Sequence, residues 1–124
     1  MSSLRTQLEE KLDVAEVVQV TSELVKIESH RDAPGRELRC AQKIAQFFTD
    51  WGMKPELAEV LEGRPNVYCT LKGSGGGMAL MLNGHTDTLP ANQLEYPAFD
   101  PYLKDGILYG SGTVHMKRAL ACII

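Results

Sequence analysis

The stretch Met78-Ala-Leu-Met-Leu-Asn-Gly-His-Thr-Asp-Thr-Leu-Pro90 decides how the rest of the chain is interpreted. Its apolar part, residues 78–82, is long enough for one buried strand and too short for a stable helix. Two polar side chains that are able to take part in a metal site, His85 and Asp87, follow where that strand is expected to end. Because ligands and metals gather beyond the carboxyl ends of strands in open α/β sheets, the stretch predicts a site at the edge of a sheet.

Length and composition are those of an ordinary globular protein. The chain has 124 residues, of which 44% are hydrophobic and 23% are charged, and its formal net charge is -3. We therefore expect a single domain, 1–124, with neither nucleic acid nor membrane as a partner. No run approaches the roughly 18 apolar residues of a membrane span, and residues 1–10 lack the apolar segment of a signal peptide, so a cytoplasmic location is expected.

The three cysteines, Cys40, Cys69 and Cys122, lie far apart in the sequence and form no Cys-x-x-Cys pair. An odd and scattered set argues against a disulfide framework and against a thiolate zinc site. We expect all three to be reduced thiols.

Two amphipathic helices are predicted before the organising stretch. Apolar residues recur at helical spacing over 13–26, where Asp13 is a plausible N-cap and Glu16 completes an approximate capping box. A second helix is predicted over 36–51, ended by Gly52.

A hairpin is predicted next, from strands over 54–61 and 66–72. The glycine-rich loop 73–77 follows it. Glycine-rich loops that cradle phosphate open helices, whereas this loop precedes a predicted strand, so a flexible turn is the better interpretation.

After Pro90 the sequence predicts an irregular stretch over 91–101 and a hairpin over 102–110 around Lys104-Asp105-Gly106. A helix is expected from Met116 onward, with an apolar stripe that reaches the last residue. This order of elements favours a mixed α/β class. The uncovered stripe suggests the N-terminal piece of a larger protein, with self-association through an open apolar C-terminal edge.

His85 and Asp87 are two residues apart, so extended backbone would place both side chains on one face. A histidine that binds metal through one ring nitrogen usually donates its other N–H to a carboxylate, which fixes the tautomer. The alternative is a pair of polar side chains that satisfy each other and bind nothing.

Two segments together resemble a known family. Leu82-Asn-Gly-His-Thr-Asp-Thr-Leu-Pro90 closely resembles the first metal motif of the zinc-dependent aminoacylase and carboxypeptidase family, which includes acetylornithine deacetylase, succinyl-diaminopimelate desuccinylase, glutamate carboxypeptidases of the G type and aminoacylase. Tyr109-Gly-Ser-Gly-Thr-Val-His-Met-Lys117 resembles its second motif, and Gly63-Arg-Pro-Asn-Val67 fits the preceding strand entry.

The resemblance implies an α/β fold, namely a partial, truncated three-layer zinc-peptidase-like catalytic domain without the inserted lid or dimerisation domain. The implied function is metal-dependent hydrolysis of amide or peptide bonds in N-acyl amino acids or small peptides, of the deacetylase or carboxypeptidase type. By resemblance, His85 binds one zinc ion and Asp87 is the catalytic-site carboxylate that orients it. Zinc would polarise the substrate carbonyl and lower the pKa of a bound water toward about 7.

The chain departs from the family pattern at Ser111, where the family has Arg, at Arg118, where it has Gly, and at His115, where it has an aspartate that bridges two zinc ions. Two divalent ions about 3.5 Å apart repel by roughly 20 kcal/mol at an effective dielectric of about 20. A neutral imidazole brings no charge to offset this. We therefore expect at most one zinc ion, with His115 as a substituted metal ligand; the alternative is that His115 binds nothing.

In the family the general base and the remaining ligands come after the second motif. This piece by itself is therefore expected to be inactive. The alternative function is a non-catalytic remnant or interaction module that keeps the half-domain fold.

Overall fold

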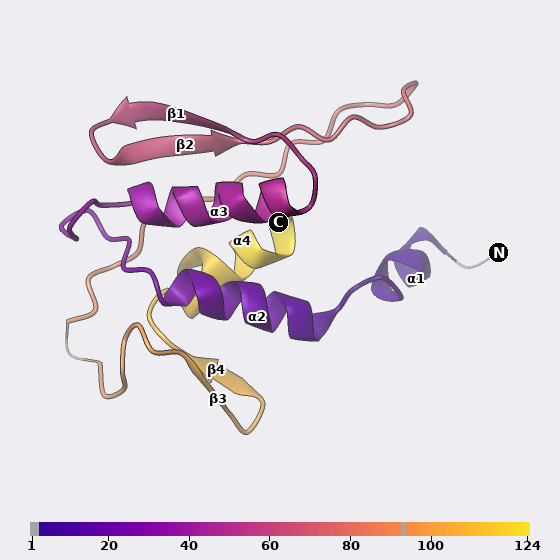
Figure 1. Cartoon of the computed structure of the whole chain (residues 1–124). Coiled ribbons are helices and arrows are strands. Elements are labelled where there is room, and N and C mark those ends of the chain that lie inside the picture. Colours follow the sequence, from indigo (N-terminus) through magenta and orange to yellow (C-terminus); the bar gives the residue numbers. More distant parts are fainter. Residues whose placement is uncertain (1–2, 93) are drawn as a thin grey trace.

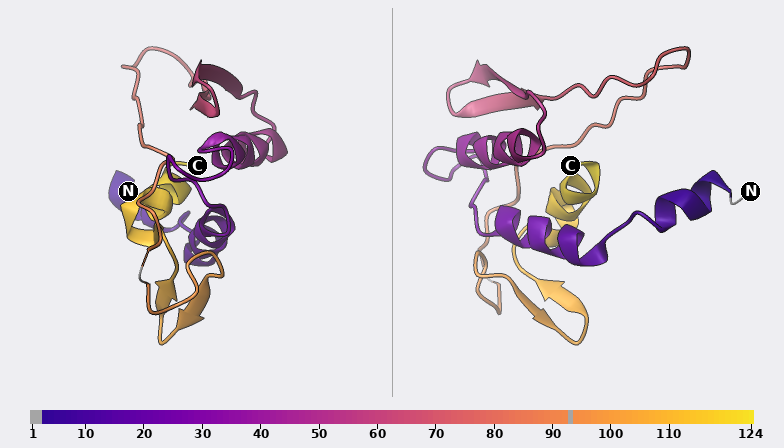
Figure 2. Two further views of the ribbon diagram at one scale, coloured as in Figure 1. Left: turned by 90° about the vertical axis from the view of Figure 1, so that its left-hand side faces the viewer. Right: turned by 45° about the vertical axis from the view of Figure 1, so that its right-hand side comes forward.

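Three helices form the centre of the molecule and lie between two small hairpins, in a computed structural model that describes residues 3–92 and 94–124 (Figure 1). The central helices are α2 (Val14–Val25), α3 (Leu38–Asp50) and α4 (Arg118–Ile123). Figure 2 shows that the two hairpins lie at opposite ends of this group of helices. The mixed helix and strand class is therefore as predicted.

Local sequence signals set the ends of the first two central helices. The Asp13 side chain accepts hydrogen bonds from the backbone N–H groups of Ala15 (2.8 Å) and Glu16 (3.3 Å), which confirms it as the N-cap of α2. Gly52 follows α3 with a φ of 77°, a left-handed conformation that glycine adopts without strain.

A short additional helix, α1 (Leu4–Glu9), was not predicted. Its N-cap is Ser3, whose hydroxyl accepts a hydrogen bond from the Thr6 N–H at 3.2 Å. Figure 1 shows that α1 projects away from the helical centre.

The apolar core joins the three central helices. Each contributes buried side chains: Val20 and Leu24 from α2, Cys40 and Ile44 from α3, and Leu120 and Ala121 from α4. Leu120 and Ala121 of α4 therefore pack into the core, and self-association through the C-terminal edge stays a prediction.

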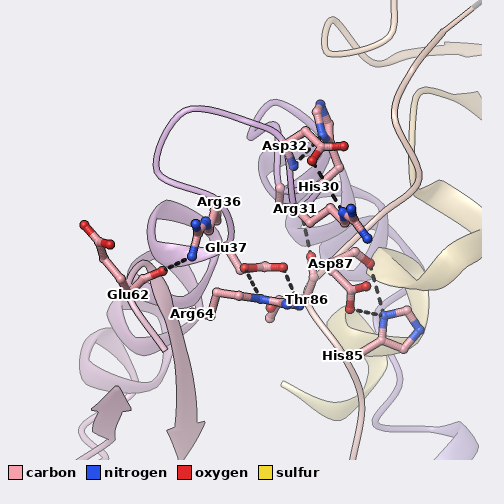
Figure 3. Close-up of polar contacts among 11 residues, drawn as sticks. His30, Arg31, Asp32, Arg36, Glu37, Glu62, Arg64, His85, Thr86 and Asp87 are labelled. Atoms are coloured by element: carbon pink, nitrogen blue, oxygen red, sulfur yellow. Dashed lines mark hydrogen bonds and ion pairs between the residues drawn. The ribbon is translucent and has the colours of Figure 1, made fainter. Parts of the chain in front are cut away.

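The first hairpin consists of β1 (Glu56–Leu61) and β2 (Arg64–Tyr68), which pair antiparallel with Leu57 opposite Val67. The predicted hairpin is confirmed, although its second strand begins two residues earlier than expected. Arg64 attaches it to the start of α3, because its Nε and Nη2 atoms lie 2.9 Å from the two carboxylate oxygens of the buried Glu37 (Figure 3).

The second hairpin pairs β3 (Tyr102–Lys104) with β4 (Ile107–Tyr109), as predicted. The connecting Asp105 and Gly106 have φ values of 51° and 77°. Positive φ at both central residues matches the right-handed twist of the strands, and Asp-Gly is a preferred pair for it.

The predicted buried strand over 78–82 is wrong. Among the described residues these five pair with no other strand, and Met78 and Met81 are 100% and 86% exposed. A strand needs a hydrogen-bonding neighbour as well as an apolar pattern. The two sheets present are separate antiparallel pairs, and the described residues contain no parallel sheet.

The last helix begins later than expected. Met116 has a φ of -135° and a ψ of 26°, so the chain makes an irregular turn, η1 (Thr113–Lys117), before α4 begins at Arg118.

Two expectations fall partly outside the described residues: the polar N-terminal segment at positions 1–2 and the irregular stretch at position 93. In the part of the chain that the structure describes, no helix is long and apolar enough to cross a membrane.

Candidate metal centre

His85 and Asp87 contact each other in the extended segment before β3. The Nδ1 atom of His85 lies 3.0 Å from Oδ1 of Asp87 and 3.1 Å from the Asp87 backbone carbonyl oxygen (Figure 3). Both partners are acceptors, so Nδ1 carries the proton and Nε2 keeps its lone pair. The side chains of His85 and Asp87 are 41% and 49% exposed, so solvent reaches the His85 ring that carries Nε2.

His115 brings a second imidazole to the same place from η1. The rings of His85 and His115 have their centroids 4.8 Å apart and are tilted by 59°. His115 is exposed. The two motifs, 30 positions apart in sequence, therefore place two potential nitrogen ligands side by side.

Two glycines allow the motif segments to approach each other. A Cβ atom added at Gly84 would lie 2.5 Å from Cε of Met116 and 2.8 Å from Cδ2 of Leu120. A Cβ atom added at Gly112 would lie 2.6 Å from Cγ2 of Thr88. Real Cβ atoms do not make contacts this short, so both positions require glycine or a local rearrangement.

A set of buried polar groups connects both motifs to the end of α2. The Ser29 hydroxyl donates to the Thr86 carbonyl at 2.8 Å, and the Thr88 N–H donates to the Ser29 carbonyl at 3.3 Å. Lys117, which is fully buried, donates from Nζ to the Ile27 carbonyl at 2.5 Å.

Burial controls the ionisation of two groups in this region. Burial lowers the pKa of the Lys117 ammonium below its ordinary value of 10.5, against the opposing charges of Cys40 and Glu28. Burial also raises the pKa of the Cys40 thiol above 9.0, while Lys117 and a hydrogen bond from Ser29 act in the opposite direction.

The donor set fits one metal ion incompletely. His85 offers Nε2 and His115 offers a ring nitrogen, which are normal zinc ligands. Within residues 3–92 and 94–124, no group of three or more His, Cys, Asp or Glu side chains is placed to hold a metal ion. The two imidazoles can supply two nitrogen ligands to one ion, and the Asp87 carboxylate is already engaged by His85.

The other positions that depart from the family pattern lie around η1. Ser111 is buried, and its N–H donates to the Ala98 carbonyl at 2.7 Å. Arg118 is exposed at the start of α4. Among the described residues, neither side chain forms a hydrogen bond or an ion pair with His85 or Asp87, so the structure gives them no role at this site.

Sequence reasoning missed Ser29 and Lys117. Ser29 lies in a stretch that the sequence marks only as a helix breaker, and Lys117 had no assigned role at the end of the second motif. Their contacts span 57 and 90 positions of sequence, so no local pattern announces them. For Lys117, the one available sequence signal is a charged residue at the start of a helix that was predicted to be apolar.

Comparison with known proteins finds similarity to one family of peptidases. Residues 81–124, which contain both motifs, match the family described as Peptidase family M20/M25/M40. The acetylornithine deacetylases of Vibrio campbellii and Vibrio parahaemolyticus are each 38% identical to the chain over 85 residues, or 66% of the chain and 22% of the relative. The N-formyl-4-amino-5-aminomethyl-2-methylpyrimidine deformylase of Bacillus subtilis is 30% identical over 128 residues, covering 98% of the chain and 29% of that enzyme.

These matches confirm the resemblance predicted from the two motifs: the chain is related to the M20/M25/M40 peptidases, a family of hydrolases. It spans about a quarter of the length of the curated relatives that it matches.

Proposed function

We propose that the chain carries the first part of the metal centre of a metal-dependent hydrolase that cleaves amide bonds in N-acyl amino acids or small peptides. The observation that carries this proposal is the arrangement of His85, Asp87 and His115. Asp87 fixes the tautomer of His85, and the centroid of the His115 ring lies 4.8 Å from that of the His85 ring. The named activities of the relatives, a deacetylase and a deformylase, are both cleavages of an acyl group from nitrogen.

The proposed roles are specific for each residue. His85 binds zinc through Nε2, His115 supplies a second nitrogen in the position of the family aspartate, and Asp87 accepts the Nδ1 proton of His85. When bound, the ion would supply a Lewis acid for the substrate carbonyl. The chain's own contribution is to hold the two imidazoles in place and to leave the remaining coordination positions open to solvent and substrate.

We further propose that the 124 residues alone do not hydrolyse these substrates. Catalytic zinc usually has three protein ligands and a nearby group that accepts a proton from water. Among the described residues only two nitrogens meet at this place, and Asp87 is engaged by His85.

Zinc content measured on the purified protein tests the proposal. The parent chain is expected to hold up to one zinc ion, and His85→Ala is expected to lose it. His30→Gln is the matched control, because His30 is the remaining histidine and contacts Glu28 and the backbone of Asp32 instead. A parent chain that binds no zinc, or an equal loss in His30→Gln, would contradict the proposal.

The second candidate, a non-catalytic interaction module, is favoured by one observation. The apolar residues Met78, Leu80, Met81 and Leu82 are all exposed in one extended segment. A zinc-free protein that forms a defined dimer in sedimentation, and that becomes monomeric in Leu80→Lys, would support this candidate over the hydrolase.

A further inference from the structure

The segment after α2, Ile27–Ser29, contacts both motifs of the candidate metal centre. We infer that Ser29 and Lys117 are positioning residues, which hold the two motifs against this segment and thereby set the distance between His85 and His115. The inference rests on the proposed function for its purpose, but the contacts that support it do not involve a metal.

Ser29 holds the first motif on both sides of Asp87. Its hydroxyl donates to the carbonyl of Thr86 at 2.8 Å, and its own carbonyl accepts from the N–H of Thr88 at 3.3 Å. Ser29 is fully buried, so water does not compete for these bonds. The backbone flanking Asp87 is therefore fixed by one residue, although residues 78–90 have no strand partner among the described elements.

Lys117 holds the second motif two residues after His115. Its Nζ atom donates to the carbonyl of Ile27, and its backbone N–H donates to the Gly112 carbonyl at 2.9 Å, closing the turn that contains His115. The stem of Lys117 also lies close to Gly112, where an added Cβ would be 3.3 Å from its Cδ. Lys117 thus closes the turn through its backbone and attaches it to Ile27 through its side chain.

The segment that receives these contacts is itself rigidly attached. The Ile27 N–H donates to the Leu24 carbonyl at 3.1 Å, and Leu24 and Val25 are fully buried in α2. The two motifs therefore share one reference point, and a shift of either contact changes the separation of the imidazoles.

The buried ammonium group of Lys117 is not expected to increase the stability of the fold. Removing a charged group from water is costly, and an apolar side chain of similar length usually packs there with equal or better stability. Cys40 and Glu28 are the charged or ionisable groups whose fields act on Lys117. The directional bond to Ile27 is what an apolar residue lacks, and this favours positioning as the role of Lys117.

The test uses Ser29→Ala and Lys117→Met in the full chain, with zinc alone as the probe. The first readout is the nuclear Overhauser effect between the ring protons of His85 and His115 in zinc-free protein, which a ring separation of 4.8 Å should give. The second is the zinc dissociation constant, measured by competition with a chromophoric chelator. Loss of an outer contact at a metal site typically weakens affinity about 10–100-fold, and both variants are expected to fall in this range and to lose the ring-to-ring signal.

Two matched controls separate positioning from folding. Ser22→Ala removes a half-buried hydroxyl whose hydrogen bond, to the Val18 carbonyl at 2.8 Å, lies within α2. Lys43→Met removes a lysine that pairs with Glu23 on the helical surface. Both controls should keep the ring-to-ring signal and the zinc affinity of the parent.

The outcomes distinguish the inference from the proposed function. If Ser29→Ala and Lys117→Met keep both the ring-to-ring signal and the zinc affinity, the positioning role is wrong and the hydrolase proposal stands. If the parent binds no zinc but the variants lose the ring-to-ring signal, the positioning role stands and the hydrolase proposal fails. If Lys117→Met does not fold, Ser29→Ala decides the question, because it removes only one hydroxyl group.

Discussion

The carboxylate of Asp87 lies 3.0 Å from the Nδ1 atom of His85, on the side of the imidazole away from the nitrogen that would face a metal ion. This contact holds the ring in one tautomer before any ion binds. It also gives a histidine side chain that is 41% exposed a fixed ring orientation.

We therefore expect Asp87→Ala to weaken zinc binding by about 10–100-fold, the usual effect of removing the carboxylate partner of a metal-binding histidine. The thermal unfolding temperature should change little, because the pair is half-exposed. Zinc competition titration measures the effect. Asp100→Ala, which removes an exposed aspartate near β3, is the control and should bind zinc as the parent does. If Asp87→Ala binds zinc with the same affinity as the parent, this carboxylate does not orient His85 for metal binding.

His115→Asp is expected to raise the amount of zinc bound per chain. The aspartate supplies a negative charge between two cations that otherwise repel by roughly 20 kcal/mol at close approach. His115→Asn has nearly the same shape without the charge and is the matched control. Elemental analysis after equilibration with zinc gives the number of zinc ions bound per chain. Equal zinc content in the Asp and Asn variants would contradict the electrostatic explanation.

The helices α2 and α3 and the second hairpin were predictable because their signals are local. Asp13 caps α2 through its own side chain, Gly52 ends α3 through its own backbone freedom, and Asp105-Gly106 selects its turn by positive φ. Each of these choices depends on residues within four positions of one another, so the sequence alone is sufficient to make them.

The segment 78–82 shows where this reasoning ends. Its apolar pattern predicts a strand, but whether a segment becomes a strand depends on a hydrogen-bonding neighbour elsewhere in the chain. The candidate site shows the same division. The contact between His85 and Asp87 follows from a spacing of two, whereas the contacts of Ser29 and Lys117 depend on how α2 and η1 pack together.

Gly112→Ala is expected to destabilise the fold and to separate the motifs. Its φ of 79° costs a side chain about 1–2 kcal/mol, and the new Cβ would lie 2.6 Å from Cγ2 of Thr88. Gly76→Ala is a matched control, because Gly76 has the same φ of 79° and no heavy atom within 4 Å of an added Cβ. The difference in unfolding free energy between the two variants, measured by chemical denaturation, reports the close contacts of the new Cβ, of which that with Thr88 is the shortest. If the two variants lose equal stability and keep equal zinc affinity, the close approach of Gly112 and Thr88 has no role in the site.

The buried thiol of Cys40 predicts a loss of stability in alkaline solution. Burial raises the pKa of this thiol above 9.0, so between pH 9.0 and the folded-state value the unfolded chain has released the proton while the folded chain retains it. The free energy of unfolding then falls as pH rises, by up to about 1.4 kcal/mol per pH unit. Lys117 acts in the opposite direction, because burial lowers its pKa and its unfolded form holds the extra proton up to pH 10.5.

Cys40→Ala removes the titrating thiol and also the field by which Cys40 raises the pKa of Lys117, and both changes make the alkaline loss of stability less steep. Cys40→Ala is expected to be less stable at pH 7 because it leaves a cavity, but its stability should fall less steeply above pH 9.0. Cys122→Ala, which removes an exposed thiol, is expected to follow the parent curve. Urea denaturation between pH 7 and 10.5 measures all three slopes. A Cys40→Ala curve parallel to that of the parent would mean that the thiol ionises equally in the folded and unfolded chains, and burial of Cys40 would then have no bearing on alkaline stability.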